Sequence, residues 1–200
     1  MALISIPNEK QIILNSLEVF VPDQMNRSVW TGRSQVVGLP GAEMWFLTAS
    51  LEPLVTEKEE RPWRAFIFNM RGRQNHFHFP LCKQCHIGPR PTVGAGATAG
   101  YSLPLSGMQP STRILEAGQY MTVPLPSGHH RTVMLTSDLN ADASGQATAT
   151  LNIALGEVPA GGTVVETALP FIPVVNADPR VTLSYEGSVS GAQFSLEEKL

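Results

Sequence analysis

The sequence predicts a mainly β protein with one helix, in which a small β-barrel is inserted into a first, discontinuous β domain. Its 17 glycines and 16 prolines are scattered rather than clustered, which is typical of many short strands joined by turns. One segment alone has the apolar spacing of an amphipathic helix. After about residue 89 the composition changes, and up to residue 167 only short strand patterns separated by turn signals occur.

The chain before the helix is predicted to form an antiparallel hairpin. Residues 30–37 end in two β-branched valines, and residues 43–51 carry apolar side chains on both faces of a second strand. Residues 39–42 have the proline and glycine of a turn. The three tryptophans are expected in the core or at a subunit interface rather than on a carbohydrate-binding platform: Trp30, Trp45 and Trp63.

The predicted helix begins near Glu59 or Glu60 and ends at Gly72. A capping box starting at Thr56 is an alternative, but it would place Pro62 inside the helix, where proline removes a hydrogen bond. The apolar stripe has the spacing i, i+3, i+4, i+7: Trp63, Phe66, Ile67 and Met70. Acidic residues gather at the N-terminal end, where they complement the helix dipole: Glu57, Glu59 and Glu60.

The remaining predicted elements are short strands. One covers 75–81, ahead of the Pro89-Arg90-Pro91 junction. Those of the inserted segment are expected at 101–105, 120–125, 131–136, 146–153 and 163–167. The C-terminal ones are expected at 171–175, 181–185 and 192–196.

The C-terminal strands are expected to join the N-terminal sheet, because so few strands form no stable unit alone. The first domain then comprises residues 1–88 and 168–200, and the inserted barrel-like domain comprises residues 89–167. Such an insertion requires its two ends to lie close together.

Charge and hydropathy exclude several classes of protein. A formal net charge of −3 argues against binding nucleic acid through its phosphates. No apolar run reaches the roughly 18 residues of a membrane-spanning helix, and Met1–Pro7 lacks the features of a secretory signal. We therefore expect no nucleic-acid sequence recognition, no membrane insertion and synthesis in the cytoplasm.

The segment Cys82-Lys83-Gln84-Cys85-His86 is the strongest chemical signal. It matches the c-type haem attachment motif, but that attachment requires export. Because the sequence shows no secretory signal, haem attachment is not favoured. Zinc binding stays open, with His78 or His86 as further ligands, although structural sites usually use two such knuckles. A redox pair would need a helix N-terminus to lower one thiol pKa. The favoured interpretation is two small, half-buried loop residues, so no metal and no cofactor is expected.

No catalytic arrangement is recognisable in the sequence. Neither Gly-x-Ser-x-Gly nor His-Glu-x-x-His occurs, and the helix-start glutamates are explained by the dipole. His129-His130 is expected at a hairpin tip, with the two side chains on opposite faces. We therefore expect no enzyme and no catalytic residue.

Several short motifs gain meaning from their order and spacing. Those of the first domain are Trp30-Thr31-Gly32, Leu51-Glu52-Pro53-Leu54, Trp63-Arg64-Ala65-Phe66 and Met70-Arg71-Gly72-Arg73-Gln74-Asn75. Those that follow are Leu115-Glu116-Ala117-Gly118-Gln119-Tyr120, Asp142-Ala143-Ser144-Gly145-Gln146-Ala147 and the C-terminal Ser195–Leu200. Together they resemble the distal tail proteins found at the tail tip of long-tailed bacteriophages. Three features depart from that family: Gln119 in place of an acid, the histidine- and cysteine-rich segment 76–86, and the His129-His130 pair in the inserted barrel.

The resemblance implies a β-sandwich-like, ring-forming domain made from both ends of the chain and an inserted OB-like barrel. It implies a virion structural protein, a homohexameric ring that links the tail tube protein to the tail-tip hub or baseplate. Such a ring would be assembled in the host cytoplasm and located in the virion. Two alternatives stay open: a glycan- or protein-binding module that uses the inserted barrel, and a small zinc-binding protein that uses Cys82 and Cys85.

Overall fold

The computed structural model describes residues 2–82, 84–180, 182–186 and 189–199. The chain is mainly β, with one helix among the described residues, and it divides into two compact units. The first unit comprises residues 1–19, 45–80 and 171–200, and the second comprises residues 20–44 and 81–170. Residues 20–44 therefore group with the inserted segment, which the sequence did not indicate.

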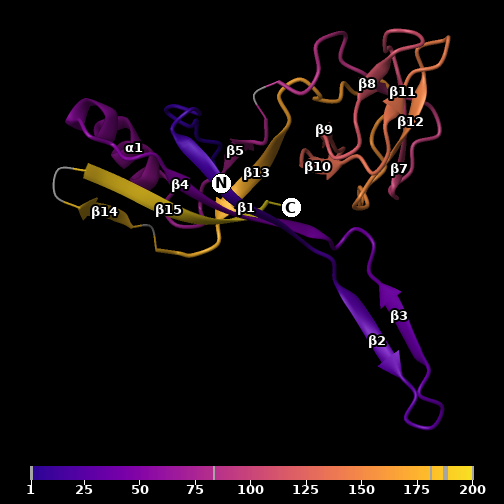
Figure 1. The fold of residues 1–200 in the computed structure, drawn as a ribbon, viewed down its shortest axis with the longest axis horizontal. Coiled ribbons are helices and arrows are strands. Elements are labelled where there is room, and N and C mark those ends of the chain that lie inside the picture. The colour runs from indigo at the N-terminus through magenta and orange to yellow at the C-terminus, as the bar shows by residue number, and fades with distance from the viewer. Residues whose placement is uncertain (1, 83, 181, 187–188, 200) are drawn as a thin grey trace. The chain divides into compact units, whose positions relative to one another are not determined.

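The first unit is built on one sheet with the order β1-β4-β15-β13-β5, in which β14 also pairs with β15 (Figure 1). The bounds of its strands are Ile12–Phe20 for β1, Met44–Leu51 for β4, Phe77–Pro80 for β5, Phe171–Asn176 for β13, Leu183–Glu186 for β14 and Val189–Glu198 for β15. The C-terminal strands complete the N-terminal sheet, as expected, because β15 lies between β4 and β13. Of the strand predicted over 181–185, Val181 lies outside the described residues.

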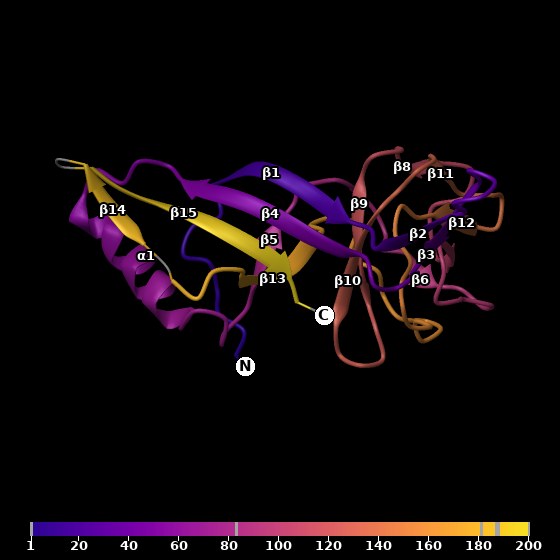
Figure 2. The ribbon, with the colours of Figure 1, turned by 90° about the horizontal axis from the view of Figure 1, so that it is seen from below.

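Period-two alternation places the apolar side chains of the sheet on one face. On β4 the buried residues are Trp45, Leu47, Ala49 and Leu51. Helix α1 (Glu57–Asn69) lies beside β14 and β15 (Figure 2) and contributes Trp63, Phe66 and Ile67 to the core. Trp63 and Phe66 meet edge to face with ring centroids 5.5 Å apart, and Phe66 meets Phe77 at 5.2 Å.

The start of α1 corrects the sequence-based expectation. The helix begins at Glu57, with Thr56 as N-cap, and Pro62 lies inside it. The capping box is complete: the Thr56 hydroxyl accepts from the Glu59 amide at 3.3 Å, and the Glu59 carboxylate accepts from the Thr56 amide at 3.2 Å. These two bonds satisfy backbone donors that would otherwise be unpaired, and the helix starts at this capping box although Pro62 removes a hydrogen bond farther along.

In the second unit, β2 (Asp23–Arg27) and β3 (Ser34–Gly38) form an antiparallel hairpin. The expected pairing of residues 30–37 with residues 43–51 is wrong. Gly32 has a φ of +66° and belongs to the loop between β2 and β3, closed by a hydrogen bond from the Gly32 amide to the Ser28 carbonyl. The polar strand β2 escaped prediction because Asp and Asn have low strand propensity and Met25 is its only apolar residue.

The inserted segment contains three small antiparallel sheets, β12-β7-β6, β10-β9 and β11-β8. Their bounds are Thr92–Val93 for β6, Ser102–Ser106 for β7, Arg113–Leu115 for β8, Tyr120–Pro124 for β9, His130–Met134 for β10, Leu139–Asn140 for β11 and Ala147–Thr150 for β12. Residues 163–167 form no strand but make single bridges, from Val164 to Thr92 and from Glu166 to Thr122. Among the described residues these sheets do not close into a barrel.

The two ends of the inserted segment lie side by side. The Val165 amide donates to the Pro91 carbonyl at 2.9 Å, and the Val93 amide donates to the Thr163 carbonyl at 2.9 Å. This satisfies the geometric requirement for an insertion.

Candidate functional site

Among the described residues, the most exposed large apolar side chains, Val29 and Trp30, lie on the β2–β3 arm, which we define as residues 23–38. Every residue of β2 and β3 is exposed. At the tip, Val29 and Trp30 have 95% and 97% of their surface exposed. Of the two places expected for Trp30, the core is therefore wrong and a subunit interface stays a prediction, whereas Trp45 and Trp63 are buried in the core.

The two faces of the arm differ in character. Met25 lies opposite Val36 and forms an apolar pair at the centre of one face, between the pairs Asp23–Gly38 and Arg27–Ser34. On the other face, Gln24 lies opposite Val37, Asn26 lies opposite Gln35, and the Gln24 amide donates to the Asn26 side-chain oxygen at 3.5 Å. An isolated hairpin is at best marginally stable in water, so an arm with these apolar side chains is suited to packing against another surface.

The chain that leaves the arm is fixed by a buried charged group. Glu43 and Arg131 each have 1% of their surface exposed. The Glu43 carboxylate accepts from the Tyr101 hydroxyl at 2.7 Å and from the Gly41 amide at 2.6 Å, and it lies 3.7 Å from the Arg131 guanidinium. Arg131 also donates to the Glu43 carbonyl at 2.7 Å and to the Ala154 carbonyl at 3.2 Å.

These contacts set the pKa values of the acid and the phenol. Burial raises the pKa of Glu43, but the hydrogen bonds from Tyr101 and from backbone amides outweigh burial and lower that pKa below its usual value. The hydrogen bond to Glu43, together with burial, raises the pKa of Tyr101. Sequence reasoning missed this group; the available signal was an arginine at the start of a predicted strand, next to Thr132 and Val133.

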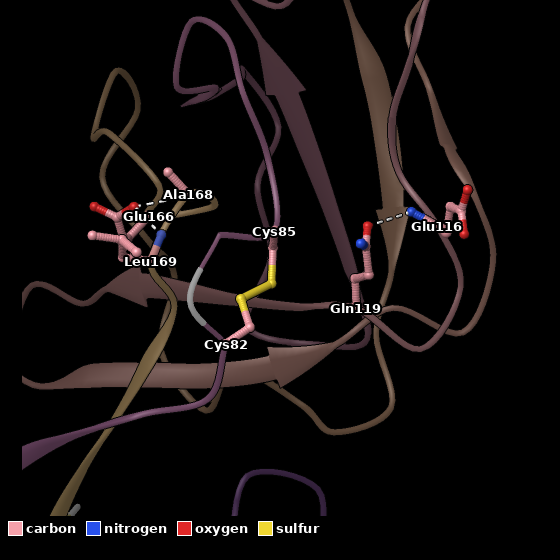
Figure 3. The surroundings of a disulfide bond; sticks show 7 residues. All are labelled: Cys82, Cys85, Glu116, Gln119, Glu166, Ala168 and Leu169. Atoms are coloured by element: carbon pink, nitrogen blue, oxygen red, sulfur yellow. Dashed lines mark hydrogen bonds between the residues drawn. A yellow bond between two sulfur atoms is a disulfide. The ribbon is translucent and has the colours of Figure 1, made fainter. Parts of the chain in front are cut away.

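Cys82 and Cys85 are joined by a disulfide in the connection between β5 and β6 (Figure 3). Both residues are half-buried loop residues. On either side of the bond, the Leu81 amide donates to the Pro170 carbonyl at 3.0 Å and the Cys85 amide donates to the Ala168 carbonyl at 2.9 Å. A disulfide offers no thiolate to a zinc ion, and no group of three metal-ligating side chains occurs among the described residues.

Glu166 holds the returning chain beside this disulfide. Its carboxylate accepts from the Ala168 and Leu169 amides at 3.0 and 2.9 Å (Figure 3) and pairs with Arg90 at 2.8 Å. The two connections of the inserted segment are thereby tied together.

Gln119 closes the turn before β9. Its side-chain oxygen accepts from the Glu116 amide at 2.8 Å (Figure 3). A carboxylate oxygen could accept the same hydrogen bond, so an acidic residue at this position would close the turn in the same way.

The histidines that the sequence singled out are dispersed. His78 stacks on Phe171 with centroids 3.9 Å apart, and a His76 ring nitrogen lies 3.5 Å from the Lys199 ammonium. His86 contacts the Pro89 carbonyl at 3.3 Å. His129 lies in the turn between β9 and β10, and His130 begins β10, as expected for a hairpin tip.

The glutamates at the start of α1 have structural partners. Glu57 pairs with Arg61 at 3.0 Å, and Glu60 pairs with Arg64 at 3.1 Å and accepts from the Tyr185 hydroxyl at 2.9 Å. These contacts agree with their interpretation as helix-end residues.

None of the helices described in the chain is long and apolar enough to cross a membrane. A comparison with protein families found none that matches the chain, and a comparison with curated proteins also found no match.

Proposed function

We propose that this chain is a non-enzymatic structural subunit that assembles into a homohexameric ring at the tip of a phage tail, between the tail tube protein and the tail-tip hub or baseplate. The observation that carries the proposal is the β2–β3 arm, whose strands are exposed throughout and whose tip presents Val29 and Trp30. The family resemblance of the sequence motifs supplies the virion location and the assembly in the host cytoplasm.

The arm favours self-association for an energetic reason. Burying one large apolar side chain contributes roughly 1.5–3 kcal/mol, and six such side chains lie exposed on the arm and directly after it: Met25, Val29, Trp30, Val36, Val37 and Leu39. In a closed cyclic assembly every copy offers one arm and one acceptor surface, so each arm is buried with no free ends. Charged residues make up only 16% of the chain, which agrees with a surface largely covered by neighbours.

The proposal includes a finer description of the fold. The first unit is the β-sandwich-like ring-forming domain, and the inserted segment is an OB-like barrel. Single bridges support the second assignment. Leu135–Leu151 joins the chain after β10 to the chain after β12, and residues 163–167 bridge both β6, through Thr92–Val164, and β9, through Thr122–Glu166. The glycan- or protein-binding alternative would use this segment as a module of a monomeric protein.

The test is the native mass of the purified chain, with negative-stain images of the particles. We expect a six-fold ring for the native sequence. A Trp30→Ser, Val36→Asp variant should remain monomeric, because the arm would lose its apolar tip and face. Ile87→Ser is the control, since Ile87 is an apolar residue outside the arm whose exposure, 82%, lies between those of Trp30 and Val36.

A native chain that stays monomeric at high concentration, alone and with tail-tube and hub proteins added, would contradict the ring. A clean monomer that binds glycan arrays would favour the alternative module. A ring that survives the double substitution would show that the arm is not its contact.

A further inference from the structure

The connection between β3 and β4 is a short loop that contains a buried charged residue. Ala42 is exposed, yet the next residue, Glu43, has only 1% of its surface exposed. The Leu39 amide also donates to the Pro22 carbonyl at 3.2 Å, which ties the two legs of the arm together at their base. The buried carboxylate therefore lies within five residues of the arm's last strand residue, Gly38.

A buried carboxylate needs compensation, because an unpaired charge in a protein interior costs several kcal/mol. Here the compensation comes from the inserted segment, through the Tyr101 hydroxyl and the Arg131 guanidinium. Arg131 also binds the Glu43 and Ala154 carbonyls, so one guanidinium joins the loop to residues 131 and 154 of that segment.

A second, independent observation places the same loop on the same surface. Gly41 has a φ of +88°, and a Cβ added there would lie 3.1 Å from the Gly156 Cα. Gly156 has a φ of +78°, and its own Cβ would lie 3.7 Å from the Gly41 Cα. The two backbones approach so closely that a side chain at position 41 would force them apart.

We propose that residues 99–101, 131 and 154–156 form a seat for the base of the β2–β3 arm, and that Glu43 is the positioning residue that locks the arm's base into this seat. The inserted segment thereby gains a role of its own, which is to set where the arm leaves its chain. The consequence for assembly rests on the proposed function, whereas the seat itself does not.

The direct test is hydrogen exchange of the purified chain, read on peptides that cover residues 39–44 and 99–101. We expect Glu43→Ala to accelerate exchange of both peptides by about tenfold or more, because it leaves Arg131 buried without its carboxylate. Tyr101→Phe removes a single donor at a half-exposed position and should give a smaller change at the same two peptides. Glu52→Gln, at an exposed glutamate, is the control that should change neither.

Two further readouts separate a positioning role from a general loss of stability. Gly41→Ala perturbs the seat from the other side and should reproduce the same exchange footprint. Peptides covering β9 and β12 should keep native exchange in Tyr101→Phe, which shows that the segment stays folded. In ring assays, Glu43→Ala and Tyr101→Phe should reduce ring yield in the order of their exchange effects.

The outcomes are distinguishable. If the native chain forms no ring but Glu43→Ala produces the footprint, the proposed function fails and the seat stands. If the native chain forms rings and Glu43→Ala exchanges like the native chain at residues 39–44, the seat is refuted. Rings of normal yield in a variant with a clear footprint would show that Glu43 holds the loop without positioning the arm, which also overturns the proposal.

Discussion

At the scale of single residues, Glu43 makes the stability of the protein depend on pH. Its lowered pKa means that its stabilising contribution is fully present above the unfolded-state pKa of about 4.3 and is lost as the pH falls through the lower pKa of the folded state. Tyr101, with its raised pKa, contributes below pH 10 and loses its contribution as the pH rises above that value. The groups that face the carboxylate include Tyr101, Arg131 and the backbone of Gly41, Glu43 and Ala154.

We therefore predict that Glu43→Gln flattens the acid limb of the stability profile. The native chain should lose stability steadily between about pH 5 and pH 3, whereas the variant should be less stable at pH 7 but change less over that interval. Urea unfolding followed by circular dichroism at each pH measures both curves. Parallel curves would show that Glu43 contributes nothing to the acid dependence.

The cysteines lead to a second prediction at this scale. A disulfide that closes so short a loop restricts the unfolded chain little, so we expect Cys82→Ser with Cys85→Ser to lower the unfolding free energy by at most about 2 kcal/mol. The backbone bonds of Leu81 and Cys85 to residues 170 and 168 remain in this variant. Chemical denaturation and native mass check the result, and elemental analysis of the native chain checks for bound zinc. A larger loss of unfolding free energy, or zinc bound in stoichiometric amount, would favour a structural metal site at Cys82 and Cys85.

At the scale of elements, sequence patterns predicted best where one strong signal decides the structure. The apolar stripe of α1 is such a signal, and the structure buries the residues that it indicates. The sequence predicts β4 to be apolar on both faces, and the structure buries the side of Trp45 and Leu47 more deeply than the side of Met44 and Phe46. The sequence does not predict the pairing of β2 with β3, although residues 30–37 are expected to form a strand, because neither strand has a buried face and no hydrophobic alternation marks them. The Glu43 seat escaped because its members are far apart in sequence, and no local pattern joins residues 43, 101 and 131.

At the start of α1, the capping box at Thr56 favours a helix that includes Pro62, whereas proline disfavours a helix interior. The contribution of the cap can be tested directly. Thr56→Ala should cost about 0.5–2 kcal/mol of stability, because the Glu59 amide loses its hydrogen-bond acceptor. Thr56→Ser keeps the acceptor and should stay within a few tenths of a kcal/mol of the native chain. Denaturant titrations of both variants measure the difference. Equal losses for serine and alanine would show that the methyl group, rather than the hydroxyl, matters at this position.

At the scale of the whole molecule, each unit is built from separated stretches of the chain. Two deletions can therefore test which stretches each unit needs. The chain crosses between its units at residues 19–20, 44–45, 80–81 and 170–171. From the sequence alone, replacing residues 91–167 with a short Gly-Ser linker should leave a folded, ring-competent core. The proposed seat changes the expectation of ring competence. The deletion would remove Tyr101 and Arg131, the two side chains of the inserted segment that bind Glu43.

We therefore predict that the chain lacking residues 91–167 keeps a folded first unit but forms no ring, whereas truncation from residue 181 abolishes folding. The truncation removes β15, the strand that lies between β4 and β13, and with it Phe194 and Leu196, which are both buried. Losing two such side chains at roughly 2–5 kcal/mol each consumes most of a typical domain's stability. The deletion spares this sheet, and the adjacent ends of the excised segment, joined by the Val165–Pro91 hydrogen bond, allow a short linker to bridge them. Circular dichroism melting reports on folding and native mass reports on assembly. If the truncated chain melts cooperatively and the deletion variant does not, the second unit is not an insertion in the first, and the chain is better described as two consecutive domains.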